Sequence, residues 1–122
     1  MSQDKIGKYS VPILWDKKLK TIVNNESAEI IQILNSEFND VAANPGLDLA
    51  PKSAKRSMAA VDPWIYEFIN NGVYRCGFAT SQEAYDIAIV NYTKHMEKLD
   101  KLLAKSKFVA GDQMTLSDIR LW

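Results

Sequence analysis

Residues 11–34 read VPILWDKKLKTIVNNESAEIIQIL, and this stretch decides the fold of the first part of the chain. Two short apolar segments, 11–16 and 21–25, lie on either side of a basic turn, and this pattern predicts a β-hairpin. Pro12 cannot donate a hydrogen bond to a sheet ladder. We therefore expect the first strand to lie at an edge or to leave backbone groups open.

A helix is predicted to follow the hairpin directly. Apolar residues recur at intervals of three and four from Ile30 to Phe38, and the helix is expected to end near Asn39. Its first turn exposes backbone N–H groups at the positive end of the helix dipole, which suits a carboxylate. Glu26 and Ser27 lie at this start, so an amine can meet Glu26 while a carboxylate meets Ser27. This predicts a site for the α-amino acid end of a small ligand, with a plain helix start as the alternative.

The composition is that of one ordinary soluble domain, with 122 residues that are 47% apolar and 25% charged. Fifteen basic and 15 acidic residues balance, so we expect no nucleic acid and no membrane as partner. The single cysteine, Cys76, excludes an internal disulfide, and the first residues lack the apolar core of a secretion signal. These features predict a cytoplasmic protein. The lone His95 has no companion at metal-ligand spacing, so no metal is expected.

The domain organisation is predicted from changes in composition. Residues 1–41 carry the hairpin and its helix. Residues 42–60 contain Pro, Gly, Ser and Lys at positions typical of a linker, and the basic run 52–56 is interpreted as a solvated part of it. Residues 61–122 are helical in pattern.

Two long helices and the start of a third are predicted in this last region. The first begins at Asp62, with Pro63 at its first helical position, and is interrupted at residues 70–72. The second begins at a capping box formed by Thr80 and Glu83. Its apolar residues recur at three-four spacing, at Tyr85, Ala88, Tyr92, Met96, Leu99 and Leu103.

The third helix is introduced by a capping box formed by Thr115 and Asp118, with Met114 and Ile119 placed as a hydrophobic staple. The sequence continues to Trp122, about two helical turns later. Isolated helices of that length are marginal. We therefore expect these residues to be an internal fragment of a longer protein.

Four segments in this order resemble the glutathionyl-hydroquinone reductases, also called xi-class or omega-like glutathione transferases. They are VPILWDK (11–17), TIVNNESAEI (21–30), NGVYRCGFA (71–79) and TLSDIRL (115–121). The resemblance covers residues 10–122. It implies an α+β, mostly α fold: the C-terminal part of a thioredoxin-like domain, made of a β-hairpin plus a helix, followed by the first helices of an all-α domain.

The resemblance also implies a glutathione site at the hairpin. Val11 offers its backbone to the cysteinyl part of glutathione, and a cis peptide bond at Pro12 leaves those groups free. Glu26 and Ser27 hold the γ-glutamyl end. Tyr74 matches the family tyrosine that lines the pocket for the quinone part. Glutathione is expected as co-substrate, quinone-type molecules as substrates, and a homodimer as the assembly of the full-length family.

The family removes glutathione reductively from glutathionyl-hydroquinones. A cysteine attacks to form a mixed disulfide with glutathione, and a second glutathione resolves it. That cysteine lies in a Cys-Pro-Trp-Ala segment before the Val-Pro strand, and the sequence contains no such segment. Cys76 does not match its position and is interpreted as inert, so no catalytic residue is predicted.

Two hypotheses from different classes remain open. The chain is either a fragment of a glutathione-dependent enzyme with part of the glutathione site, or a non-catalytic helical interaction or structural module. Translation of the flanking DNA separates them. A Cys-Pro-Trp segment upstream favours the enzyme, whereas unrelated sequence with a clean start and stop favours the module.

Overall fold

The computed structural model describes residues 10–122, so the expected lack of a secretion signal lies outside the described residues. The chain divides into two compact units, Met1–Leu47 and Asp48–Trp122. Each unit is described by itself. Within the described part, no helix is both long enough and apolar enough to cross a membrane.

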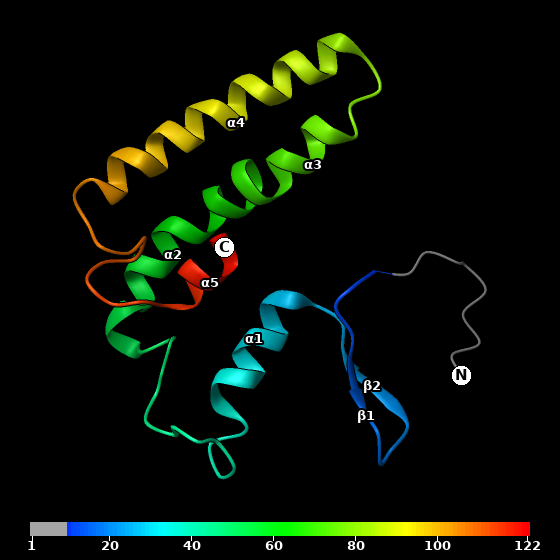
Figure 1. Ribbon diagram of the computed structural model, residues 1–122, viewed down its shortest axis with the longest axis vertical. Helices are drawn as coiled ribbons and strands as arrows, with labels where there is room; N and C mark the ends of the chain where they lie inside the picture. The colour runs from blue at the N-terminus through cyan, green and yellow to red at the C-terminus, as the bar shows by residue number, and fades with distance from the viewer. Residues whose placement is uncertain (1–9) are drawn as a thin grey trace. The chain divides into compact units, whose positions relative to one another are not determined.

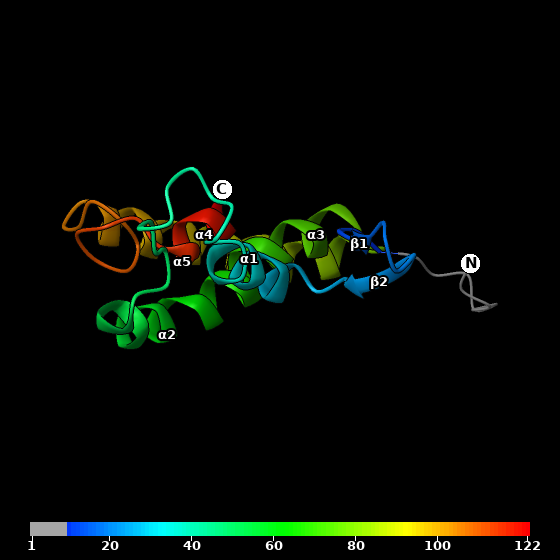
Figure 2. The same cartoon turned by 90° about the horizontal axis from the view of Figure 1, so that it is seen from below.

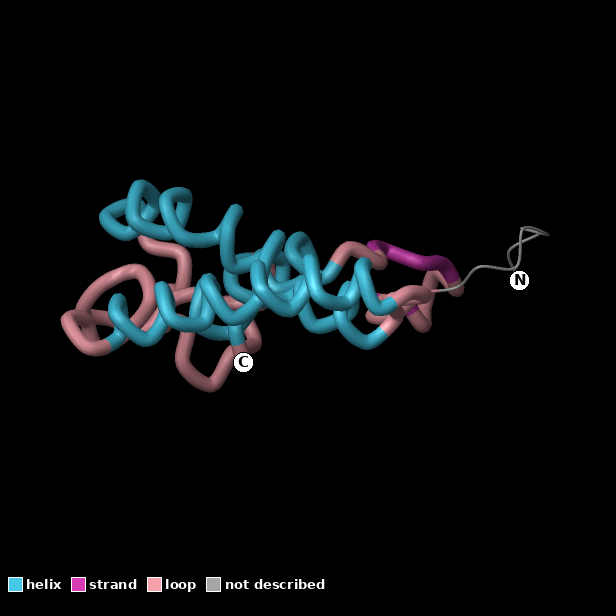
Figure 3. Tube along the Cα trace, turned by 90° about the horizontal axis from the view of Figure 1, so that it is seen from above, coloured by secondary structure: helices cyan, strands magenta, loops and turns pink. Residues whose placement is uncertain are grey.

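The first unit begins with the predicted β-hairpin (Figure 1). Strand β1 (Leu14–Asp16) pairs antiparallel with β2 (Thr21–Asn24). The turn closes because the Asp16 carboxylate accepts hydrogen bonds from the backbone N–H groups of Lys18 and Leu19, at 2.7 and 2.8 Å. The first strand starts later than predicted, and residues 11–13 approach it as irregular backbone. In Figure 3 this hairpin is the magenta part of the chain, and the remaining described residues are helix or loop.

Helix α1 (Ser27–Ser36) begins where the sequence predicts. Its buried residue is Ile30. The helix ends three residues earlier than expected. At its end the Ser36 hydroxyl lies 3.0 Å from the Gln32 carbonyl oxygen and 2.7 Å from the Glu37 carboxylate. Such local side-chain bonds compete with continuation of a helix.

Part of the segment that the sequence predicts to be a linker is helical in the second unit. Residues 52–60 are helical: a 3₁₀ turn, η1 (Lys52–Ala54), leads into α2 (Lys55–Trp64). The predicted helix start at Asp62 and Pro63 is wrong, since both lie in the last turn of α2. Good helix formers fill the first turns of α2, and Ala54 and Val61 are buried. This burial outweighs the linker-like composition.

The helix that begins with α2 does not break at residues 70–72, as predicted, but continues through a wider, π-helical segment. The π-helical segment η2 (Ile65–Asn70) follows α2 directly and leads into α3 (Asn71–Gly77). A proline inside a helix removes one backbone bond and clashes with the preceding turn, and Pro63 lies just before the wide turns. Gly72 lies close to Tyr92: a Cβ atom at position 72 would be only 3.1 Å from the tyrosine ring.

The longest helix, α4 (Gln82–Leu103), runs beside the α2–η2–α3 run, as Figures 1 and 2 both show. Its cap is Ser81 instead of the predicted Thr80: the Ser81 hydroxyl oxygen accepts a hydrogen bond from the Ala84 N–H at 3.2 Å. The predicted apolar face is partly right. Leu99 is buried, while the outer positions of that face are more than a third exposed: Tyr85, Met96 and Leu103.

The core of the second unit forms where α2, η2 and α4 meet the loop after α4. Its buried residues are Val61, Ile65, Ile69, Leu99 and Val109. Helix α5 (Leu116–Leu121) packs against α2 and η2, and its predicted capping box is present. The α+β, mostly α class is thus confirmed. The domain boundaries 1–41, 42–60 and 61–122 stay a prediction.

Candidate functional site

The start of α1 is built by Glu26. This residue is the N-cap, with extended backbone at φ −93° and ψ 113°. Its carboxylate accepts a hydrogen bond from the Ala28 N–H at 3.3 Å, and its carbonyl oxygen accepts one from the Ile30 N–H at 2.9 Å. The Ser27 hydroxyl lies 3.5 Å from the same carboxylate. One of the N–H groups expected to face a ligand is therefore satisfied by Glu26 itself.

Asn24 fixes the turn between β2 and α1. Its side-chain oxygen accepts a hydrogen bond from the Glu26 N–H at 2.7 Å, and its amide nitrogen donates to the Glu29 carboxylate at 2.5 Å. Two carboxylates thus lie at the start of α1, Glu26 at the N-cap and Glu29 in the first turn, where the helix dipole favours negative charge. Carboxylates in this arrangement suit the ammonium group of an amino acid.

Val11 and Pro12 lie at the same end of the hairpin. The Asn25 side chain donates to the Ser10 hydroxyl oxygen at 3.5 Å, so the residues just before β1 meet those just after β2. The Val11–Pro12 bond is cis, which confirms the prediction for this bond. Val11 is 90% exposed. The structure therefore brings the four residues predicted to bind glutathione to one end of the first unit.

Tyr74, predicted for the quinone pocket, lies in the second unit on α3. The residue is 64% exposed, and its ring stacks parallel to that of Phe78 with the ring centroids 6.3 Å apart. Cys76 lies on the same helix as a partly buried free thiol. The role predicted for Tyr74 stays a prediction.

His95 is a packed side chain. Its ring stacks on Phe68 with the centroids 3.9 Å apart, and Nδ1 lies 2.8 Å from the Asn91 carbonyl oxygen. Across residues 10–122, no three or more His, Cys, Asp or Glu side chains gather closely enough to hold a metal ion. The absence of a metal from the function stays a prediction.

A pocket between α3 and α4 was not predicted from the sequence. Its volume is about 540 Å³, and residues of η2, α3, α4 and the loop between α3 and α4 line it. Tyr92, which lies on the predicted apolar face of α4, packs against the core and also contributes to the pocket wall together with Phe68. The available signal was a set of small residues on the facing helices: Gly72, Ala84 and Ala88.

Proteins of similar sequence indicate the family to which the chain is related. No model of a protein family matches it. The glutathionyl-hydroquinone reductase YqjG of Escherichia coli is 46% identical over 116 residues, which are 95% of this chain and 35% of that protein. The reductase PcpF of Sphingobium chlorophenolicum is 47% identical over 116 residues, 95% of this chain and 37% of that protein. The chain thus spans little more than a third of these relatives.

Solved structures agree with the sequence relatives. The glutathione-bound structure of Escherichia coli YqjG matches with a TM-score of 0.89 and 45% identity, over 95% of this chain and 38% of that one. Glutathione transferase Xi 1 of Trametes versicolor matches with a TM-score of 0.89 and 45% identity, over 97% of this chain and 41% of that one. By sequence and by fold, the chain is therefore a homologue of a segment of the glutathionyl-hydroquinone reductases, the xi class of glutathione transferases.

Proposed function

We propose that the chain is the part of a glutathione-dependent reductase of glutathionyl-hydroquinones that binds glutathione at the start of α1. The observation that carries the proposal is the convergence of Val11, Pro12, Glu26 and Ser27 at one end of the hairpin. The match to a glutathione-bound relative at 45% identity supports glutathione as the ligand.

Each residue has a chemical role in this proposal. The Glu26 carboxylate binds the α-ammonium group of the γ-glutamyl part, and Ser27 with the helix dipole binds its carboxylate. The exposed Val11 backbone pairs with the cysteinyl backbone of glutathione, as an added strand pairs with a sheet edge.

The proposed reaction balances with two glutathione equivalents. A thiolate attacks the glutathionyl sulfur, the carbon–sulfur bond breaks, and the hydroquinone leaves with a proton. A second glutathione then reduces the mixed disulfide, which releases oxidised glutathione and restores the thiol. The described residues offer Cys76 as their thiol, and we assign it no part in this step. The quinone substrates, a homodimer and the cytoplasmic location belong to the same proposal.

Titration of the 122-residue chain with glutathione, followed by amide NMR, tests the binding site. Saturable shifts are expected at residues 24–30, with a dissociation constant on the order of millimolar, because a partial site is poorly preorganised. Glu26→Ala or Ser27→Ala should weaken binding about five- to tenfold, since each removes a charged or hydroxyl contact.

Glu37→Ala is the matched control, because it removes an exposed acid from the far end of the same helix. Unchanged affinity in Glu26→Ala, or an equal loss in Glu37→Ala, contradicts the proposed site. A chain without saturable shifts favours the alternative, a helical interaction module.

A further inference from the structure

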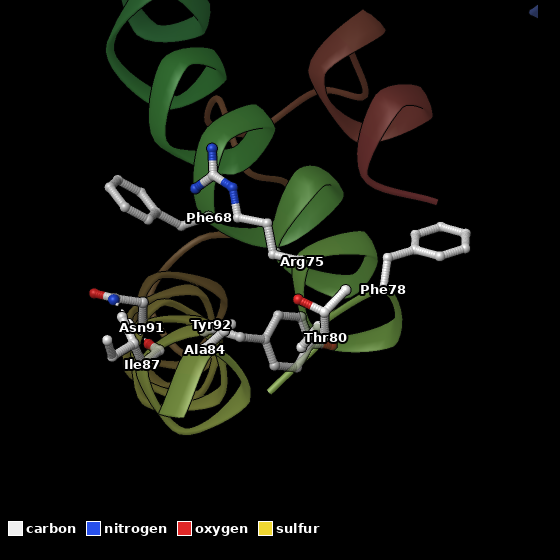
Figure 4. A pocket seen from close by; sticks show the side chains of 11 residues that line it. Phe68, Arg75, Phe78, Thr80, Ala84, Ile87, Asn91 and Tyr92 are labelled. Atoms are coloured by element: carbon white, nitrogen blue, oxygen red, sulfur yellow. Dashed lines mark hydrogen bonds between the residues drawn. The ribbon is translucent and has the colours of Figure 1, made fainter. Parts of the chain in front are cut away.

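The pocket between α3 and α4 is lined by residues of the second unit, whereas the residues proposed to bind glutathione belong to the first. Its volume of about 540 Å³ is within the range of small-molecule sites, roughly 300–1,000 Å³. Tyr74 does not line it. The lining residues named in Figure 4 are Phe68, Arg75, Phe78, Thr80, Ala84, Ile87, Asn91 and Tyr92.

The hollow results from small side chains beside one large ring. Gly72 on α3 lets the Tyr92 ring approach the helix, and a Cβ there would lie 3.1 Å from the ring. Ala84 and Ala88 on α4 leave space that longer side chains would fill. Figure 4 shows the Tyr92 ring projecting from α4 towards Thr80. The pocket therefore has an aromatic wall and an apolar floor.

The residues that line the pocket carry positive charge only. Arg75 is basic, and none of the lining residues is acidic. One guanidinium nitrogen of Arg75 contacts the Glu67 carboxylate at 2.6 Å, but Glu67 lies outside the lining. Both side chains are about half exposed, at 51% and 44%, and such pairs are weak in water. Arginine has five N–H donors, so Arg75 keeps donors for a second anion.

Asn91 adds a neutral polar group. Its amide nitrogen donates to the Ile87 carbonyl oxygen at 2.9 Å, which orients the side chain at the pocket edge. Thr80 contributes a hydroxyl group. A mostly apolar cavity with a few polar groups at its rim is typical of a site for a small organic ligand.

We propose that this pocket binds a small aromatic carboxylate, with its ring against Tyr92 and its carboxylate on Arg75. An aromatic body fits the apolar wall, and a planar carboxylate matches the fork of a guanidinium group. The residues that line the pocket belong to the second unit and those proposed to bind glutathione to the first, so different variants test the two proposals.

The probe is naphthalene-2-carboxylate, and the control ligand is naphthalene-2-methanol, which keeps the ring without the charge. Each is titrated into the 122-residue chain while the methyl signals of Ala84 and Ala88 are followed by NMR. Saturable shifts of these methyl signals are expected with the acid, and the alcohol should bind about fivefold more weakly. No saturable shift with the acid, or equal affinity for the two ligands, overturns the proposal.

Three variants test the contacts. Arg75→Gln should weaken binding of the acid about fivefold and leave the alcohol unchanged, whereas Glu67→Gln should strengthen binding of the acid, because a competing carboxylate is lost. Ala88→Leu should abolish binding of both ligands by filling the pocket. Arg56→Gln, at an exposed position on α2, is the charge-matched control.

Arg75→Gln and Glu67→Gln change half-exposed side chains, so they keep the test valid if Ala88→Leu does not fold. Equal losses in Arg75→Gln and Arg56→Gln, or weaker binding of the acid in Glu67→Gln, contradict the proposed role of Arg75. Glutathione affinity, measured on the same samples, is expected to be the same in all four variants.

Discussion

Asp118→Ala is expected to destabilise the second unit strongly. The Asp118 carboxylate accepts three hydrogen bonds, from the Val109 N–H at 2.9 Å, from the Thr115 N–H at 2.8 Å and from the Thr115 hydroxyl at 3.1 Å. Val109 is 3% exposed and Thr115 is 0% exposed, so truncation leaves buried donors without a partner. At a net value of about 1 kcal/mol for each hydrogen bond, the free energy of unfolding should fall by about 3 kcal/mol.

Urea unfolding followed by far-UV circular dichroism measures this loss. With a slope of about 1.5 kcal/mol per molar urea, the transition midpoint should fall by about 2 M. Asp112→Ala is the control, because it removes an exposed acid from the loop before α5 and changes the net charge equally. The loss of unfolding free energy in Asp118→Asn should lie between the losses in Asp118→Ala and Asp112→Ala, since asparagine keeps one acceptor oxygen. A loss below about 1 kcal/mol for Asp118→Ala, or one equal to the control, refutes the reasoning.

Three further predictions follow from single side chains. Ser117→Ala should raise the free energy of unfolding by about 1 kcal/mol in the same urea assay, because its buried hydroxyl has no hydrogen-bond partner among the described residues. Asn24→Ala should lose amide-exchange protection in the first turn of α1 by about tenfold, whereas Asn25→Ala should not. The 122-residue chain should show no turnover of glutathionyl-hydroquinones in a hydroquinone-release assay, and Cys76→Ser should not change that; turnover abolished by Cys76→Ser would place the nucleophile on α3.

The elements that the sequence predicts well are those with a local signal. The hairpin has a basic turn closed by Asp16, and α5 has a capping box with both partners in the sequence. At the start of α4 two hydroxyl residues are adjacent, so the pattern does not decide between Thr80 and Ser81. Local chemistry thus predicts the helix but leaves its cap open by one residue.

Helix α2 was missed because it lacks a start signal. Its N-cap is Ala54, which has no side chain that can cap, and Pro63 inside the helix is more typical of a helix start. The helix is instead held by tertiary packing of Val61 and its neighbours in the core. Tertiary packing of this kind is not visible in local periodicity.

The two candidate sites also differ in how far the sequence alone predicts them. Glu26 and Ser27 are adjacent in the sequence, so a helix-start pattern finds them. The pocket depends on Gly72 of α3 meeting Tyr92 of α4, a contact between residues far apart in the chain. A sequence pattern reports small residues on each helix separately, but only the fold shows that they face one hollow.

The separation into units bears on the proposed chemistry. The residues proposed to bind glutathione lie in the first unit, and the single thiol, Cys76, lies in the second. Attack on a glutathionyl sulfur requires the thiolate and the bound glutathione to be held within bonding reach of each other. Neither unit by itself contains both groups. The proposed glutathione binding therefore involves residues of the first unit alone, whereas turnover requires a thiol aligned with its ligand.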